Sequence, residues 1–388
     1  MLALPHVSYA GIPLTTPGGG GSSVLYRALG GLFDANSSDA RSANQVRLVD
    51  FTTPSGGTST IRRVFYANTA ADSGKRIRAV ITDTSGVVLG YSGDVTLTSD
   101  RLTELALVSP IENLPASTGY RVGINYESAS TQRVSSVGSA FSATATFSSA
   151  LPGTLTLSAS SNPINCWALC EQAGTVTGSD FIAESGDGRA AARSFMDVNV
   201  PNDYAVGDIA LLLMFAGFTS GGAGATIPTP SGWTLVSDST YAGHRSLLFA
   251  RRLDGTESPV IYMSQSGGSI DRMFLKTAIF RGMVASGSYY EAFAGNSGGS
   301  NTAPTGNAIT TLGDNRLLVD TFHASNDSTL TPDSGWAKAV EELTLSGSDA
   351  ALAITTKDAP TAGSQSAQSG TYDVAANWRV NSLALIRA

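Results

Sequence analysis

The chain has 388 residues and a formal net charge of −7, and charged side chains make up only 14% of it. Average soluble domains carry about 25% charged residues, so this composition disfavours long solvated helices and favours short strands joined by turns. The length predicts two or three domains with full hydrophobic cores. The acidic balance argues against nucleic-acid binding, because recognition of phosphates needs a basic footprint.

Residues 1–45 predict an irregular N-terminal arm, because prolines and four consecutive glycines break any periodic pattern. Apolar groups at 24–26 and 32–33 leave two interpretations open, a flexible leader or an arm that orders on a neighbouring subunit. The first residues lack a basic region followed by an apolar run, so we expect no signal peptide and synthesis in the cytoplasm. No stretch reaches roughly 18 apolar residues, so we expect no membrane insertion.

Residues 46–172 predict an antiparallel β-sandwich of short alternating strands separated by turns. The clearest strand covers 120–126, where Tyr120, Val122, Ile124 and Tyr126 share one face. This strand follows the segment Leu-Pro-Ala-Ser-Thr-Gly at 114–119. Together with an earlier Asp-Thr-Ser-Gly turn, the segment resembles a module of phage fibres and secreted carbohydrate-active proteins. The resemblance covers about a third of the chain and implies a carbohydrate-binding or adhesive role.

The two cysteines are Cys166 and Cys170. On one strand their Cα atoms would lie about 13 Å apart, which is too far for a disulfide. Two thiols alone do not complete a zinc site. We therefore interpret them as small buried hydrophobic residues.

Residues 173–388 contain an internal repeat. A Gly-Asp turn and an apolar strand begin at 206 and again at 312, and each is followed by a Ser-Gly-Trp corner and two further strands. The repeat predicts a duplicated unit, about 206–282 and 312–388, which forms two facing sheets of one sandwich joined by residues 284–305. Trp233 and Trp336 occupy equivalent positions, so we expect them to be structural aromatic corners.

This half of the chain resembles a domain that recurs in virion proteins of tailed bacteriophages. The matching motifs are the strand at 206–213, the Pro-Ser-Gly-Trp corner at 230–233 and the terminal strand at 278–282. The second copy departs from the pattern because Asp333 stands between Pro332 and Ser334. The resemblance covers roughly half of the chain, and it implies a structural place in a virion rather than catalysis.

A search for catalytic and metal-binding patterns finds none. The three histidines are His6, His244 and His323, and no acid stands near them in a recognised pattern. A Gly-x-Ser-x-Gly match at 295–299 lies in a Gly/Ser-rich connection, not at a strand-to-helix turn. The closest acidic group is Asp180, Glu184 and Asp187, whose spacing does not fit a calcium loop. We expect no cofactor, no metal and no enzyme activity, although glycosidase carboxylates on separate strands leave no sequence pattern.

Tyr289 and Tyr290, which stand in the Gly/Ser-rich connection, are the best candidates for stacking against a ligand such as a sugar ring. Trp167 and Trp378 also stand on expected strands and could stack on a sugar, and Trp378 is interpreted as packing inward.

The composition and the two resemblances together predict an all-β chain with two antiparallel, jelly-roll-like β-sandwich domains behind the arm. The predicted function is that of a non-enzymatic phage virion component, a capsid decoration or head-fibre protein made in the host cytoplasm. The alternative is a tail-fibre or baseplate receptor-binding protein, or a carbohydrate-binding adhesin. The expected partners are major capsid or tail proteins contacted through residues 1–45, further copies of the chain and a host-surface glycan.

Overall fold

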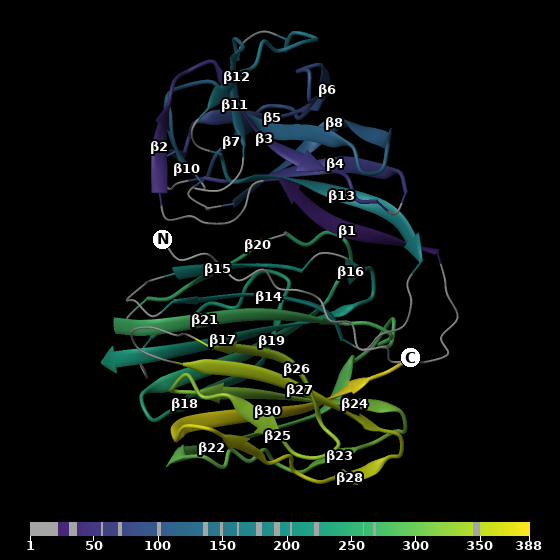
Figure 1. The fold of residues 1–388 in the computed structure, drawn as a ribbon, viewed down its shortest axis with the longest axis vertical. Coiled ribbons are helices and arrows are strands. Elements are labelled where there is room, and N and C mark those ends of the chain that lie inside the picture. The colour runs from purple at the N-terminus through teal and green to yellow at the C-terminus, as the bar shows by residue number, and fades with distance from the viewer. Residues whose placement is uncertain are drawn as a thin grey trace.

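The computed structural model describes residues 22–30, 37–55, 57–68, 72–98, 102–134, 139–147, 150–160, 163–175, 181–189, 195–201, 204–220, 225–258, 260–266, 269–343 and 350–388. The regular elements within these ranges are β-strands, and no α-helix occurs among them. The predicted all-β class is therefore confirmed. Figure 1 shows the strands of the N-terminal half stacked above those of the C-terminal half, along the longest axis of the molecule.

Two sheets pack face to face in the N-terminal half. The first consists, in spatial order, of β16 (Tyr204–Ala205), β1 (Ser22–Gly30), β13 (Cys166–Thr175), β4 (Ser59–Ala67) and β8 (Leu102–Leu114). The second consists of β12 (Ser158–Ser160), β11 (Ala140–Thr144), β3 (Gln45–Thr52), β9 (Gly119–Tyr126), β5 (Arg76–Asp83) and β6 (Val88–Tyr91), with β7 (Val95–Thr96) beside β5. A separate ladder joins β2 (Ser37–Arg41) to β10 (Ser130–Val134).

The core of this half forms between the two sheets. All four apolar residues predicted on one face of β9 lie in it, together with residues of β3, β4, β5 and β8. The opposite face of β9 approaches β3 so closely that a Cβ on Gly123 would lie 1.8 Å from the carbonyl oxygen of Arg47, so only glycine fits there. Cys166 and Cys170 are both buried and are not joined in a disulfide, which confirms their interpretation as small buried residues.

The structure corrects the irregular arm that residues 1–45 predict. Residues 22–30 form β1 and residues 37–41 form β2. Partners on both sides of β1 supply backbone hydrogen bonds that a sequence pattern cannot reveal, since β13 and β16 lie far along the chain. Residues 1–21 lie outside the described residues, and their role as an arm stays a prediction.

The C-terminal half contains two five-stranded sheets. The first has the order β14 (Phe181–Arg189), β21 (Ser269–Phe280), β17 (Ile209–Ser220), β19 (His244–Arg252) and β18 (Thr234–Tyr241). The second has the order β22 (Tyr290–Asn301), β30 (Ala376–Ile386), β24 (Arg316–Ala324), β27 (Ala351–Ala359) and β26 (Ala337–Leu343). Three short ladders flank them: β15 (Phe195–Asn199) with β20 (Val260–Ser264), β23 (Ile309–Thr311) with β28 (Gly363–Gln365), and β25 (Leu330–Pro332) with β29 (Gly370–Tyr372).

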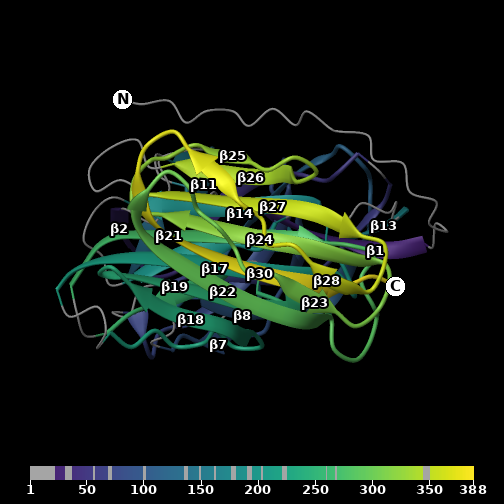
Figure 2. The same ribbon diagram turned by 90° about the horizontal axis from the view of Figure 1, so that it is seen from below.

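These two sheets have the same strand order when each strand is matched to its counterpart in the sequence repeat. β17 and β24 follow the two Gly-Asp turns, and both are central strands. Apolar side chains from both sheets meet in one core, including Leu211, Leu213, Leu317 and Leu385. Figure 2 shows the sheets lying one over the other. Each unit also includes one strand before the repeated motifs, β14 or β22, so the connection predicted over 284–305 is largely strand.

The two halves are joined by a shared ladder. β1 pairs along one edge with β13, and its other edge pairs with β16 through Leu25↔Ala205 and Tyr26↔Tyr204. An apolar cluster beside this ladder combines Val260 with four residues of β4 and β13. The side chain of Arg63 also donates a hydrogen bond to the carbonyl of Gly255, in a turn held by the Glu257 carboxylate. Strand pairing, apolar packing and a charged hydrogen bond therefore all cross this seam.

We expect deletion of residues 1–30 to lower the thermal unfolding midpoint by roughly 5 to 10 °C, because it leaves the edges of β13 and β16 unpaired. Deletion of residues 1–21 is the matched control, which keeps β1 and should change the midpoint little. Calorimetry of the three chains measures both effects. Equal midpoints for the two truncated chains would contradict the assigned place of β1.

Candidate functional site

The predicted stacking residues Tyr289 and Tyr290 lie at the start of β22, beside the core between the two C-terminal sheets. Their ring centroids are 5.6 Å apart. The Arg252 guanidinium stands 5.4 Å from the Tyr289 ring and donates hydrogen bonds to the carbonyls of Val284 and Gly287, at 2.9 and 3.1 Å. Burial also raises the pKa of Tyr289. Arg252 therefore covers one face of Tyr289, and Tyr290 is the better placed of the two for a ligand.

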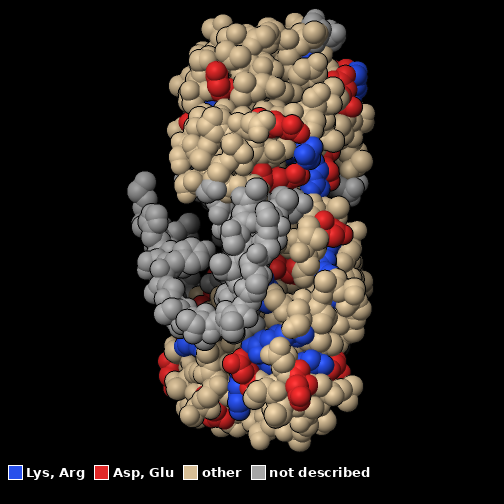
Figure 3. All heavy atoms as spheres, turned by 90° about the vertical axis from the view of Figure 1, so that its right-hand side faces the viewer, with Lys and Arg blue, Asp and Glu red and all other residues tan. Residues whose placement is uncertain are grey.

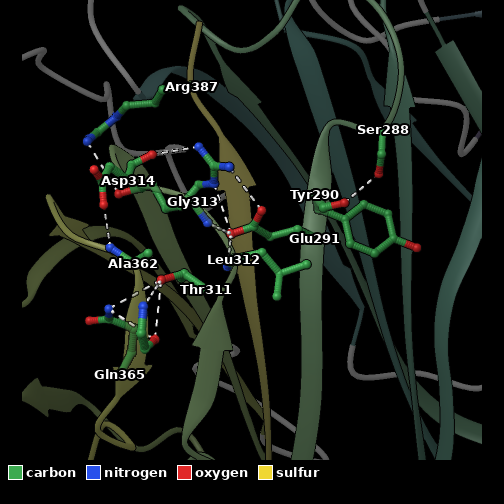
Figure 4. A network of polar contacts seen from close by, with 12 residues as sticks. Ser288, Tyr290, Glu291, Thr311, Leu312, Gly313, Asp314, Ala362, Gln365 and Arg387 are labelled. Carbon is green, nitrogen blue, oxygen red and sulfur yellow. Dashed lines mark hydrogen bonds and ion pairs between the residues drawn. The ribbon is translucent and has the colours of Figure 1, made fainter.

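Next to Tyr290, an ion pair fixes the turn that precedes β24 (Figure 4). Glu291 contacts the Arg316 guanidinium at 2.9 and 3.0 Å, and its Oε1 accepts hydrogen bonds from the backbone N–H groups of Leu312 and Gly313 at 2.8 and 3.4 Å. The hydrogen bond from Arg316, followed by the backbone donors, lowers the pKa of Glu291. The carboxylate therefore stays ionised and holds the turn in one conformation.

The rigid turn presents Leu312, which at 80% exposure is the most exposed large apolar residue among those described. Figure 4 shows the Tyr290 ring on the other side of β22 from the Glu291 carboxylate. We call Glu291, Leu312 and Arg316 the β22 surface. An apolar side chain on a preorganised turn loses little entropy on binding, so this surface is suited to contact with a partner.

The first repeat uses the equivalent turn at the seam between the two halves. Asp208 accepts a hydrogen bond from the Ala205 N–H at 2.7 Å and pairs with the Arg281 guanidinium at 2.9 Å. This arrangement positions β16 against β1. The two repeats therefore stabilise the same turn with different ion pairs, and only the turn of the first repeat supports a strand that pairs with the N-terminal half.

The structure brings together two histidines that the sequence places far apart. His244 on β19 and His323 on β24 both lie against the Phe215 ring, with centroid distances of 5.3 and 6.2 Å. His323 Nε2 is 3.5 Å from the hydroxyl of Ser246, and Asn381 donates a hydrogen bond to the same hydroxyl at 3.4 Å. Sequence analysis missed this cluster, because it depends on how the two sheets face each other.

This cluster has the partners of a packing site rather than of a catalytic one. His323 and Ser246 are 0% exposed, so a substrate has no approach to them. Burial, with a smaller contribution from Arg379, lowers the pKa of His323 to about 3, so the imidazole is neutral at physiological pH. A neutral, sealed histidine hydrogen-bonded to a serine satisfies polar groups in the core.

The predicted aromatic corners form equivalent turns. The Trp233 N–H donates to the carbonyl of Pro230, and the Trp336 N–H donates to that of Asp333, both at 3.1 Å. The glycines before them have φ of 78° and 85°. Asp333 thus takes the place of Pro230, and the extra residue leaves the turn intact.

The tryptophans differ in burial. Trp233 lies in the outer core of the first repeat, and Trp336 is only partly buried, with the Lys357 ammonium 5.8 Å from its ring. Trp167 and Trp378 are both 5% exposed. Among the described residues, the tryptophans therefore serve mainly as core residues.

The described residues contain no group of three or more His, Cys, Asp or Glu side chains placed to hold a metal ion. Asp180 and His6 lie outside the described residues, as do the side chains of Glu184 and Asp187. Within the same part of the chain, no helix is long and apolar enough to cross a membrane.

Two comparisons with known proteins give no relative: no protein-family model matches the sequence, and no curated protein matches it. The motifs, the fold and the contact geometry therefore carry the functional proposal.

We expect the buried His323 imidazole to make the free energy of unfolding depend on pH in the acidic range. The ordinary histidine pKa is 6.5, so the unfolded chain takes up the proton first, and the contribution of His323 to the stability of the folded state is lost as the pH falls from about 6.5 toward 3. Replacing His323 by Gln should remove this contribution. Urea unfolding at a series of pH values should then show the unfolding equilibrium constant of the wild type rising, per pH unit of acidification, up to roughly tenfold more than that of the variant. Parallel curves for the two chains would contradict the burial of a neutral His323.

Proposed function

We propose that the chain is a non-enzymatic structural component of a tailed-phage virion, a capsid decoration or head-fibre protein that projects from the particle. The observation that carries the proposal is the continuous ladder through β1, which joins the stacked sheets of the two halves (Figure 1). Such a ladder suits a stiff, projecting body. The resemblance of residues 206–282 to virion domains supports the same role.

The surface also suits protein contacts. On the face drawn in Figure 3, uncharged residues predominate, and acidic and basic side chains are interspersed. A mixed surface without a large basic field favours partners other than nucleic acid. The sealed position of the only His–Ser contact described fits a passive role.

Attachment is assigned in this proposal to residues 1–21, which precede β1. Ordering such a segment on a major capsid or tail protein costs conformational entropy, and buried apolar area offsets that cost at about 25 cal/mol per Å². Many copies on one particle would turn weak single contacts into firm attachment or host binding through avidity.

The second candidate is a tail-fibre, baseplate or adhesin role with a host-surface glycan as ligand. Tyr290 favours it, because its ring is partly exposed and follows Tyr289 on a strand that the neighbouring Glu291–Arg316 ion pair holds in place. Under this alternative, Tyr290→Ala should weaken binding to isolated host polysaccharide roughly two- to tenfold, from the stacking energy that one aromatic ring provides. Tyr91→Ala, which removes an exposed ring in the other half, is the matched control. Equal binding by the two variants would contradict a role for Tyr290 in glycan binding.

The virion proposal predicts where the protein is found in the producing culture. Antibody labelling of purified particles, viewed by electron microscopy, should place label on phage heads. Deletion of residues 1–21 should leave a folded chain that no longer incorporates. Label on tails would move the assignment to host attachment, and label on cell surfaces without particles would support the adhesin role. Normal incorporation of the truncated chain would contradict attachment through residues 1–21.

A further inference from the structure

The two repeats differ in one layer of side chains across their central strands. In the first repeat, Met214 pairs with Leu247 on β19 and with Leu275 on β21. In the second repeat, Asp320 occupies the same position after the Gly-Asp turn and pairs with Thr355 and Ser382. Both layers lie on the outer faces of their sheets and are buried. A polar layer with a carboxyl group thus replaces an apolar one.

Two chain segments cover this polar layer, and we call residues 302–308 and 366–370 the strap. Its parts are held together by backbone hydrogen bonds from Gly306 to Gln368 at 2.8 Å and from Gly370 to Pro304 at 2.9 Å. Gly306 lies directly on the layer. A Cβ there would stand 2.9 Å from Ser382 Oγ and 3.3 Å from Asp320 Oδ2, so only glycine allows this approach.

The polar layer is buried, but two of its polar atoms lack a hydrogen-bond partner. Asp320 is 2% exposed and Gln368 is 1% exposed. The Thr355 hydroxyl donates to Gln368 Oε1 at 2.7 Å. Among the described residues, Asp320 Oδ2 and Gln368 Nε2 have no hydrogen-bond partner. An ionised carboxylate in this position would lose its hydration with only partial compensation.

Burial raises the pKa of Asp320 from 3.8 to about 7, and the neighbouring Ser382 hydroxyl opposes this shift only in part. The other titratable groups near the layer and the strap include Lys338 and Glu341 on β26, Lys357 on β27, Tyr372 on β29 and Asp333, whose carboxylate accepts a hydrogen bond from the Ser369 N–H of the strap at 2.8 Å. Lys338 and Glu341 pair with each other at 2.6 Å, and Lys357 stands over the Trp336 ring. The shift thus has desolvation as its main cause, with no contribution from these charges.

We propose that the strap is a pH-dependent cover, which lies closed over the second sheet while Asp320 is protonated and detaches when Asp320 ionises. The proposal rests on the close contact of Gly306 with Asp320 and Ser382 and on the missing partners of the buried carboxyl. Detachment would give the carboxylate water and would uncover Val380, which Gly306 also approaches. The first repeat has no such device, because Met214 does not titrate.

The direction of the effect follows from the raised pKa. The closed state binds the proton more tightly than the open state, whose carboxyl has an ordinary pKa near 3.8. Closure is therefore most favoured below that value and weakens as the pH rises toward about 7. Above this pH the carboxyl is ionised in both states, and the opening equilibrium no longer depends on its titration.

Amide hydrogen exchange of the full chain, followed by mass spectrometry from pH 4.5 to 8.5 and corrected for intrinsic exchange, tests the proposal. The opening constant of the strap should rise by about tenfold per pH unit up to near pH 7 and then level off. Asp320→Asn, which keeps the shape but cannot ionise, should give a strap whose opening does not change with pH. Asp320→Met, which introduces the residue of the first repeat, should do the same.

The first repeat supplies an internal control in the same sample. Residues 225–228 cover its apolar layer, with Thr226 and Ser266 exchanging backbone hydrogen bonds at 2.7 and 3.0 Å. Their opening should not vary with pH. This comparison within the wild-type chain holds even if a variant fails to fold. A strap whose opening is independent of pH, or whose pH dependence persists in Asp320→Asn, would overturn the proposal.

Discussion

The backbone ladder on both edges of β1 is the interaction on which the arrangement of the molecule depends. β13 binds one edge of this strand over its whole length, and β16 binds the other. β16 is itself held in place by Asp208, which caps Ala205 and pairs with Arg281. The Asp208–Arg281 ion pair of the first repeat therefore also stabilises the contact between the two halves, because it positions β16 for pairing with β1. Among the described residues, the Val260 cluster and the hydrogen bond from Arg63 also cross the seam.

The two repeats of the C-terminal half form sheets with the same strand order but with different buried polar groups. Between the sheets, His323 is buried neutral and favours the folded state at higher pH. On the outer face, Asp320 is buried beneath the strap and favours closure at lower pH. The two groups stand on opposite faces of β24, as expected for positions three residues apart. Their opposed responses would keep overall stability level across mildly acidic pH while the strap alone responds.

Local patterns predicted the parts of the fold that depend on local chemistry. The alternation from Tyr120 to Tyr126 identified a core face, and the paired Gly-Asp turns and Trp corners identified the repeat. Pairing between strands that lie far apart in the chain leaves no local pattern, so β1 was predicted to belong to an irregular arm. The meeting of His244 and His323 depends on how two sheets face each other, which no periodicity encodes. The Asp320 layer could have been predicted from one feature of the sequence. Alignment of the two repeats places Asp320 at the position that Met214 occupies in the first repeat.

The central claim is that the two halves form one stiff body through β1. Spin labels on Val108→Cys and Leu312→Cys, two exposed positions in different halves, would report their separation by double electron–electron resonance. The native cysteines are buried and should not take up label. We expect one narrow distance distribution in the full chain and a broad one after deletion of residues 1–30. A broad distribution in the full chain would contradict the central claim.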